Sequence, residues 1–177
     1  MTKTVSFDDV YVMPTGLVIA CPTDTVYGLS CAVTDMSAIA KIQQLKSRGE
    51  NSEKHLIVLI GSVDDLQMFG IVPTEGQLHV LSQVWPGPVS IIFSGISDTW
   101  NHLSSDGTLA CRLPQHPDLS KWIQRVGPII STSANMKGKS PATTTKEVLL
   151  QFPEGIDICI EGGVCDASPS TLIKFLR

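Results

Sequence analysis

Short apolar runs recur along this chain at irregular spacing, and they constrain the fold more than any other feature. Runs of four or five residues bounded by glycine, proline or polar residues are typical of buried β-strands. Between them lie stretches with an apolar residue at every third or fourth position, which is the pattern of helices that cover a sheet. The expected strands are residues 17–20, 56–60, 89–93, 109–113, 156–160 and 171–175, with one more beginning at Ile129.

Helix start and stop signals lie between these runs. Helices are expected after a cap at Asp35 as far as Gly49, after capping boxes at Ser62 and Thr144, from residue 75 with Leu78, Leu81 and Trp85 facing inward, and over residues 119–126. Helices and strands do not alternate strictly. The pattern therefore predicts an α/β fold: a single domain over residues 1–177, with a twisted mixed β-sheet flanked by helices.

Composition restricts the classes of function. The formal net charge of −4 argues against tight autonomous nucleic-acid binding, which draws its affinity from Lys and Arg on phosphates. No apolar run approaches the ~20 residues of a membrane span, and the N-terminal residues lack the apolar core of a signal peptide. We therefore expect a cytoplasmic protein. The five cysteines have no C-x-x-C spacing and the four histidines no ligand spacing, which favours buried free thiols over a zinc site.

Two polar clusters, residues 22–29 and residues 131–135, continue apolar runs and mark a candidate site. The first places two hydroxyls, a carboxylate and a phenol in a strand-like run between a proline and a glycine. A strand that only built a core would alternate apolar and polar residues. The second is either an ordinary strand-to-turn transition or a set of short donors that can approach a nucleotide closely. Together they predict a site lined by strand ends.

Basic residues provide two further candidates. Lys46 and Arg48 lie at an expected helix end, where the helix dipole alone favours cations. As a pair they could instead clamp a phosphate, with Lys54 adding a third charge. Arg112 lies inside an apolar run, where it is costly unless it is paired, so it forms either a structural salt bridge or a contact with a ligand carboxylate or phosphate. Neither G-x-x-x-x-G-K-[ST] nor G-x-S-x-G occurs, which argues against a P-loop and a serine-hydrolase triad.

Six segments, taken in order, resemble the YrdC-like family of threonylcarbamoyl-AMP synthases in its short bacterial form. They are residues 22–29, Lys46-x-Arg48, residues 85–88, residues 112–117, residues 131–135 and residues 169–171. The resemblance extends from about residue 17 to residue 175. The chain departs from it at Asp24, where the family usually has Glu, and at Gly49, where the family usually has Pro.

The resemblance implies a YrdC-like fold and one reaction, in which L-threonine, bicarbonate or CO2, and ATP give threonylcarbamoyl-AMP and pyrophosphate. ATP is then a substrate, and Mg²⁺ arrives with it rather than at a protein metal site. The product would serve threonylcarbamoyladenosine formation on tRNA through downstream transfer proteins. The chain itself would contact tRNA only weakly or indirectly.

The resemblance also implies roles for individual residues. The expected catalytic residues are Lys46 and Arg48. ATP would be held by Lys46, Arg48, Lys54, Ser133 and Asn135. L-Threonine would be bound by Thr25, Arg112, Thr132 and Ser170.

Two alternatives remain at this point. One is an RNA-binding module that uses the same basic cleft without ATP-dependent chemistry, and the net charge and the few aromatic residues count against it. The other is the related carbamoyl-transfer domain of hydrogenase maturation proteins, which normally belongs to a larger chain with zinc fingers.

Overall fold

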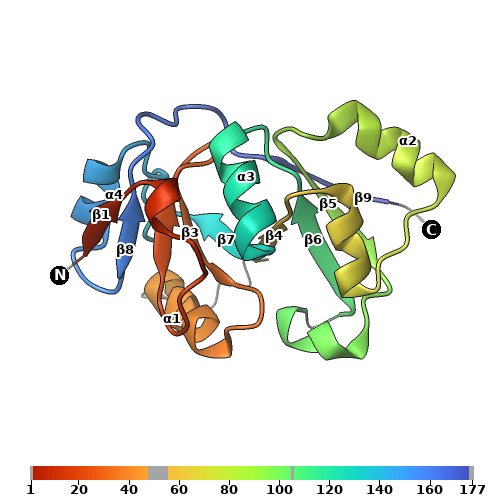
Figure 1. Ribbon diagram of the computed structural model, residues 1–177, viewed down its shortest axis with the longest axis horizontal. Coiled ribbons are helices and arrows are strands. Elements are labelled where there is room, and N and C mark those ends of the chain that lie inside the picture. Colours follow the sequence, from red (N-terminus) through yellow and green to blue (C-terminus); the bar gives the residue numbers. More distant parts are fainter. Residues whose placement is uncertain (1, 48–55, 105, 176–177) are drawn as a thin grey trace.

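The computed structural model describes residues 2–47, 56–104 and 106–175, and nine strands within them form one sheet (Figure 1). The strands are β1 (Lys3–Val5), β2 (Ile19–Cys21), β3 (Gly28–Ala32), β4 (Ile57–Leu59), β5 (Val89–Ser94), β6 (Thr108–Arg112), β7 (Ile129–Ser133), β8 (Ile158–Ile160) and β9 (Thr171–Lys174). Their order across the sheet is β1-β8-β2-β3-β7-β4-β6-β5-β9. Parallel and antiparallel neighbours both occur, so the predicted mixed, twisted sheet is confirmed.

Helices cover both faces of this sheet. They are the α-helices α1 (Met36–Ser47), α2 (Glu75–Val84), α3 (Pro117–Val126) and α4 (Thr145–Gln151), and the 3₁₀ helices η1 (Phe7–Asp9), η2 (Val63–Phe69) and η3 (Asp98–Leu103). In β2, Ala20 joins a core with α1 and α4, whereas Ile19 and Cys21 join a second core with α3 and η1. Because successive strand residues point to opposite faces, the two cores lie on opposite sides of the sheet.

The capping residues predicted from the sequence form with one exception. The carboxylate of Asp35 accepts a hydrogen bond from the N–H of Ala38 at 3.0 Å, which starts α1 as expected. At α4, Thr144 Oγ1 accepts from the N–H of Glu147 at 3.2 Å. The Glu147 carboxylate, however, accepts from the N–H of Thr143 rather than from that of the cap, so only half of this capping box is present.

Two further helix predictions have different outcomes. The capping box that opens η2 is confirmed, because the N–H of Ser62 donates to the Asp65 carboxylate at 3.1 Å. In α2, Leu81 is buried as expected, and so is Trp85, which follows the helix. The prediction that Leu78 faces inward is wrong, because its side chain is 43% exposed. Helix α2 lies at one end of the molecule and enters the core through Leu81, so it has no second buried row (Figure 1).

The strand-like interpretation of residues 22–29 is also wrong. After β2 the chain forms a loop, and β3 begins only at Gly28 and pairs antiparallel with β2. Within the loop, Thr23 Oγ1 donates to the carbonyl of Val26 at 2.8 Å and accepts from the N–H of Thr25 at 3.1 Å. Such local side-chain hydrogen bonds compete with the ladder of a strand, and here they form the turn. No sequence pattern predicted β1, η1 or η3, and the strand-like run overlaps β3 only at Gly28 and Leu29.

All five cysteines are free and buried, as expected. In the part of the chain that the structure describes, no helix has both the length and the apolar character needed to cross a membrane.

Candidate active site

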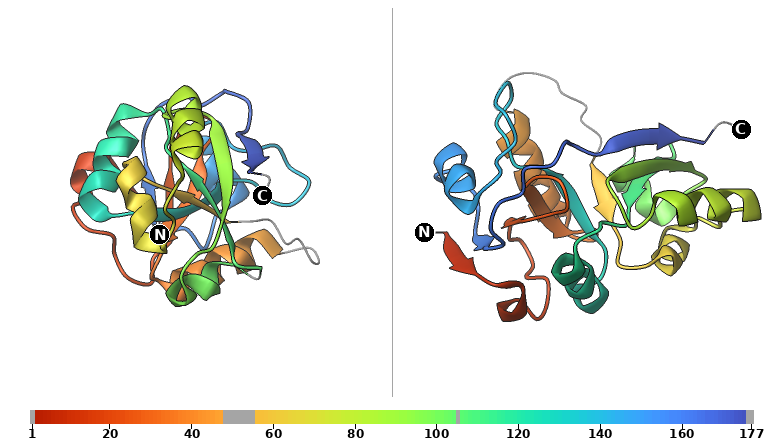
Figure 2. Two further views of the ribbon diagram at one scale, coloured as in Figure 1. Left: turned by 90° about the vertical axis from the view of Figure 1, so that its right-hand side faces the viewer. Right: turned by 90° about the horizontal axis from the view of Figure 1, so that it is seen from above.

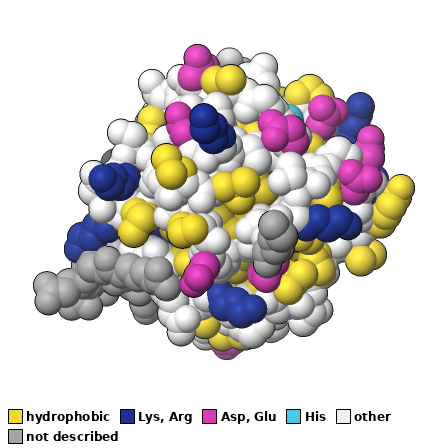
Figure 3. All heavy atoms as spheres, turned by 90° about the vertical axis from the view of Figure 1, so that its left-hand side faces the viewer, with side chains coloured by type: hydrophobic (Ala, Val, Ile, Leu, Met, Phe, Trp, Pro, Cys, Tyr) yellow, Lys and Arg dark blue, Asp and Glu magenta, His cyan; other side chains and the backbone are white. Residues whose placement is uncertain are grey.

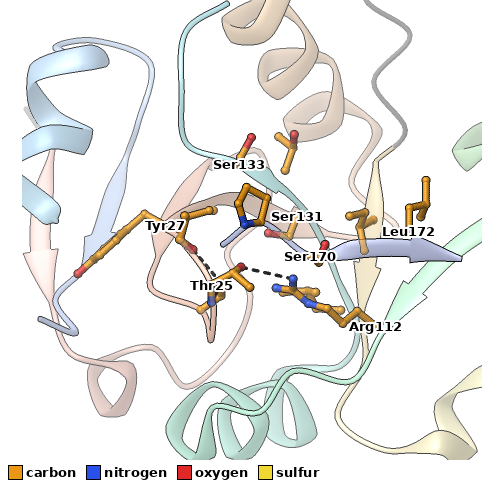
Figure 4. A pocket seen from close by; sticks show the side chains of 14 residues that line it. Thr25, Tyr27, Arg112, Ser131, Ser133, Ser170 and Leu172 are labelled. Carbon is orange, nitrogen blue, oxygen red and sulfur yellow. Dashed lines mark hydrogen bonds between the residues drawn. The ribbon is translucent and has the colours of Figure 1, made fainter. Parts of the chain in front are cut away.

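A pocket of about 450 Å³ opens where the two polar clusters meet (Figure 4). Its walls come from the β2–β3 loop, from β4, β6 and β7, and from the segment that leads into β9. The predicted site residues that line it are Thr25, Arg112, Thr132, Ser133 and Ser170. The fold thus brings together residues that are far apart in the sequence, as the two-cluster prediction required.

Arg112 ends β6, and its side chain is buried against Asp24 of the β2–β3 loop. Arg112 Nη2 lies 3.2 Å from Asp24 Oδ1, and each side chain is only 6% exposed. Asp24 Oδ2 accepts a hydrogen bond from the N–H of Gln115 at 3.1 Å, which fixes the carboxylate. The structural salt bridge considered from the sequence therefore exists, and it holds the guanidinium at the edge of the pocket.

This ion pair leaves hydrogen-bonding capacity unused. Arg112 Nη1 reaches Thr25 Oγ1 at 3.4 Å. Neither Arg112 Nε nor Asp24 Oδ1 has a hydrogen-bond partner among the described residues. Burial lowers the pKa of Arg112 from its usual value, and the Asp24 carboxylate opposes that shift, but a guanidinium stays charged in proteins. Because an unsatisfied buried donor is costly, an anionic ligand that paired with Nε would be favoured here.

A crossing segment, residues 161–170, connects β8 to β9 at the far edge of the sheet (Figure 2), and its last two residues, Pro169 and Ser170, line the pocket. Two contacts place its end over the pocket. The N–H of Ala167 donates to the carbonyl of Thr25 at 3.2 Å, and the hydroxyls of Ser170 and Ser90 are 3.0 Å apart. Ser90 is fully buried in β5, so Ser170 is held against the sheet while it lines the pocket.

Tyr27 holds the start of the crossing segment by hydrogen bonds. Its side chain is fully buried, and its hydroxyl donates to the carbonyl of Gly163 and accepts from the N–H of Gly162, both at 3.1 Å. Gly162 lies so close to the ring of Pro22 that a Cβ at this position would collide with it. Burial raises the pKa of Tyr27, so the hydroxyl keeps the proton that it donates. The crossing segment is therefore hydrogen-bonded to the β2–β3 loop near both of its ends, through Tyr27 at its start and through Thr25 near its end.

Lys46 lies in the last turn of α1 and reaches the end of β7. Its Nζ donates to the carbonyl of Ser133 at 2.7 Å, to the carbonyl of Asn135 at 2.8 Å and to Asn135 Oδ1 at 2.7 Å. Asn135 Oδ1 also accepts from Ser133 Oγ at 2.6 Å, and its amide donates to the carbonyl of Lys139 at 2.9 Å. These residues form a network beside the pocket, and Ser133 is the member that lines it.

Arg48 and Lys54, the other basic residues expected to hold phosphate, lie outside the described residues, as does Gly49, the expected helix stop. Their roles stay predictions from the sequence.

Several lining residues had no role assigned from the sequence. They are Thr23, Val26, Tyr27, Gly28 and Ser131, which lie inside the two polar clusters, and Ile57, Leu59, Pro169 and Leu172, which form an apolar wall. The alternation of side chains along a strand could have indicated Ser131, which stands two residues before Ser133 on β7. Ile57 and Leu59 look like ordinary core residues in the sequence, so no pattern distinguishes them.

Metal ligands are scarce at this site. In the described ranges, no group of three or more His, Cys, Asp or Glu side chains could hold a metal ion, and the lining residues include no carboxylate. The pocket instead offers hydroxyls and one guanidinium, which suit oxygen-rich anionic ligands.

Comparison with known proteins places this geometry in context. A family model for Sua5, YciO and YrdC proteins, described as "Telomere recombination", matches residues 12–177. A protein from Enterobacter sp. (strain 638) named threonylcarbamoyl-AMP synthase is 33% identical over 147 residues, which are 81% of this chain and 76% of the relative. A protein of the same name from Neisseria gonorrhoeae is 35% identical over 169 residues, 93% of this chain and 87% of the relative.

Solved structures show the same fold. P. abyssi Sua5, crystallised in complex with L-threonine, superposes with a TM-score of 0.82 at 30% identity over 92% of this chain. This chain spans about half of the P. abyssi protein, 48% of its length. E. coli YciO superposes with a TM-score of 0.82 at 20% identity, over 100% of this chain and 92% of YciO, and this likeness concerns the fold alone.

Proposed function

This chain belongs to the Sua5/YciO/YrdC family, and from that premise we propose that it is a threonylcarbamoyl-AMP synthase, a nucleotidyltransferase. The resemblance expected from the sequence is thereby confirmed at the level of the family. The observation that carries the proposal is the pocket itself. It gathers the expected threonine contacts around a buried arginine that has an unused donor.

L-Threonine is proposed to bind at the Arg112 end of the pocket. The guanidinium pairs with the substrate carboxylate, because Arg112 Nε lacks a partner among the described residues and a planar fork matches a carboxylate. Thr25, Thr132 and Ser170 line the same pocket and supply hydroxyls for the remaining polar atoms of threonine. The complex of P. abyssi Sua5 with L-threonine supports threonine as a ligand of this fold.

ATP is the second substrate, and its phosphates are proposed to bind at the Lys46 end. Ser133 lines the pocket there, and Lys46 and Asn135 adjoin it. Arg48 and Lys54 are proposed to complete the phosphate site from outside the described residues. Because an ammonium has three N–H donors, Lys46 would exchange a carbonyl contact for a phosphate oxygen when ATP binds.

The reaction forms two bonds. The threonine amine adds to CO2 through a new N–C bond and loses a proton, which gives a carbamate; where bicarbonate supplies the carbon, water leaves. A carbamate oxygen then attacks the α-phosphorus of ATP, and the bond from that phosphorus to the pyrophosphate oxygen breaks. Displacement at phosphorus needs positioning and charge neutralisation more than covalent help. Lys46 and Arg48 are the proposed catalytic residues, since they would neutralise the phosphate charge.

Mg²⁺ is proposed to arrive with ATP. Mg²⁺ is usually held by substrate phosphates together with one or two carboxylates, and the described lining residues provide no carboxylate. We assign no step to the metal.

The proposed product would pass to proteins that transfer the threonylcarbamoyl group to tRNA in the cytoplasm. The chain itself would contact tRNA weakly or indirectly. On the face shown in Figure 3, basic and acidic side chains are interspersed rather than separated into fields of one sign. The formal net charge of −4 leaves little surplus charge for a polyanion, so a titration with tRNA at physiological salt should give a dissociation constant on the order of 10⁻⁴–10⁻⁶ M. Nanomolar binding that ATP does not displace would favour the RNA-binding alternative.

The proposed function is tested by pyrophosphate release from ATP. We expect release only when both L-threonine and bicarbonate are present, because the carbamate that attacks phosphorus contains both. Omission of either substrate is the control. Equal ATP cleavage without threonine would contradict the proposal.

A further inference from the structure

Beneath the pocket floor, three neighbouring strands each contribute one small polar side chain. They are Cys21 of β2, Ser30 of β3 and Ser131 of β7. Ser30 Oγ donates to Ser131 Oγ at 3.2 Å, and Cys21 Sγ lies 3.5 Å from Ser30 Oγ. Cys21 and Ser30 are fully buried, and Ser131, which is 6% exposed, lines the pocket. The three groups therefore form a hydrogen-bonded chain that runs from the core to the pocket.

The direction of these hydrogen bonds leaves one proton for a ligand. A hydroxyl has a single proton to donate. Ser30 donates its proton to Ser131, so the Cys21 thiol is the donor to Ser30. Burial raises the pKa of Cys21 to about 12, which keeps that thiol protonated at neutral pH. Ser131 Oγ is thus an acceptor within the chain, and its own proton has no acceptor among the described residues.

Ser131 is only 6% exposed, and its hydroxyl lies in a confined part of the pocket. The hydroxyl lies over Gly28 of β3, where any Cβ would collide with it. On its other side Ser131 pairs with Ile57 of β4, which belongs to the apolar wall. A hydrogen bond given in such a low-dielectric setting is stronger than one given in water.

Ser131 also lies midway along the pocket. On β7 it stands two residues from Ser133, at the proposed phosphate end. In the other direction, two residues away, Ile129 pairs with Leu59, which in turn pairs with Arg112 at the proposed carboxylate end. Figure 4 likewise shows Ser131 between Ser133 and Arg112.

We infer that Ser131 is a further substrate-binding residue, whose hydroxyl, oriented by Ser30, donates a hydrogen bond to an oxygen of the carbamate. The inference rests on the proposed function, because the carbamate must form between the bound threonine carboxylate and the α-phosphorus. That interval is the one that Ser131 occupies. Ser30 does not touch the substrate and is a positioning residue.

The test separates bicarbonate use from threonine binding. In Ser131→Ala, kcat/KM for bicarbonate, measured by pyrophosphate release at saturating threonine and ATP, should fall about 10- to 100-fold, as expected when a hydrogen bond to a charged group is lost. In Ser30→Ala, kcat/KM for bicarbonate should fall about 3- to 10-fold, because only the orientation of the Ser131 hydroxyl is lost. Threonine affinity, measured by calorimetry without ATP or bicarbonate, should stay near that of the wild type in both variants.

Two further variants exclude effects of shape and stability. Ser131→Cys keeps the approximate size of the side chain, but a thiol is a weak donor. The kcat/KM for bicarbonate of this variant should therefore fall about as much as that of Ser131→Ala. Cys31→Ala removes a buried side chain from the next position of β3, on the opposite face, and should lower the unfolding temperature without altering the bicarbonate profile.

The outcomes distinguish this inference from the proposed function. The inference alone would be overturned if Ser131→Ala kept the turnover and the bicarbonate dependence of the wild type, or if Ser131→Cys were fully active. An equal loss of threonine affinity in Ser131→Ala would also overturn it, because the hydroxyl would then act on threonine itself. A wild-type protein that releases no pyrophosphate with all substrates present would overturn both.

Discussion

The two ends of the pocket differ in how far the protein itself uses their hydrogen-bonding capacity. At one end, Arg112 makes a long 3.4 Å contact to Thr25, and its Nε has no partner among the described residues. At the other end, Lys46 directs its Nζ to oxygens of Ser133 and Asn135 at 2.7–2.8 Å. The guanidinium is positioned but incompletely paired, whereas the ammonium is well paired within the protein.

This difference implies two modes of ligand binding. A carboxylate that reaches Arg112 adds hydrogen bonds to a group that Asp24 already holds in position. A phosphate that reaches Lys46 must compete with the carbonyls that already accept from it. We therefore expect threonine to bind without ATP, and ATP binding to be coupled to a change at the end of β7.

The largest expected effect is on the Arg112 end. Arg112→Lys keeps the charge opposite Asp24 but loses the planar fork, so the dissociation constant for threonine should rise about 100-fold, while ATP affinity changes little. Isothermal titration with each ligand measures both. Arg125→Lys is the matched control: this guanidinium on α3 donates to the carbonyls of Phe7 and Val10, and its replacement should leave threonine affinity unchanged.

Two results would weaken the comparison. A loss of ATP affinity with intact threonine affinity in Arg112→Lys would reverse the roles of the two ends. A variant that fails to fold would mean that the fold requires the guanidinium geometry of the buried ion pair with Asp24, which an ammonium does not reproduce.

A smaller and mixed effect is expected at the Lys46 end. Lys46→Met should weaken ATP binding about 10-fold and lower the free energy of unfolding by about 1–2 kcal/mol, because the oxygens at Ser133 and Asn135 lose their donor. Threonine affinity should be retained. Lys41→Met, on the same helix and exposed, is the matched control and should change neither ligand affinity. If Lys46→Met weakened threonine binding as strongly as ATP binding, the two ends would not be separate.

Local chemistry explains which parts of the site the sequence could predict. Arg112 was conspicuous because an arginine inside an apolar strand demands a partner, and Ser133 because it stands in a cluster of short polar side chains. The cap at Asp35 followed from the position of a short acidic residue before a helical stripe. In each case a few neighbouring residues contain the whole signal.

The rest depends on tertiary contacts. The partner of Arg112 is Asp24, and no local pattern connects β6 to the β2–β3 loop. The sheet order places β8 between β1 and β2, which short apolar runs cannot specify because every such run looks alike. Leu78 fits a helical stripe as well as Leu81 does, and only the position of α2 at the end of the molecule decides which is buried.

The smallest expected effect is on the stability of α1, the helix that carries Lys46, and it concerns the cap at Asp35. Burial acts to raise the pKa of Asp35, but hydrogen bonds from the N–H groups of Ala38 and Gly16 outweigh this and lower it. A lowered folded-state pKa stabilises the fold above the unfolded-state pKa of about 4, and this contribution disappears as the pH falls through the folded-state pKa. Asp35→Ala should therefore lower the free energy of unfolding by about 1 kcal/mol at pH 7, and the difference from the wild type should shrink below about pH 4. Denaturant unfolding at several pH values measures this, with the exposed Glu154→Ala as a control that should change stability by less than about 0.5 kcal/mol. The same variant tests whether the role of Lys46 is local. ATP affinity at pH 7 should be unaffected by Asp35→Ala, because Lys46 is held by its own contacts with β7. A tenfold loss of ATP affinity in this variant would show instead that the phosphate end of the pocket depends on the whole of α1.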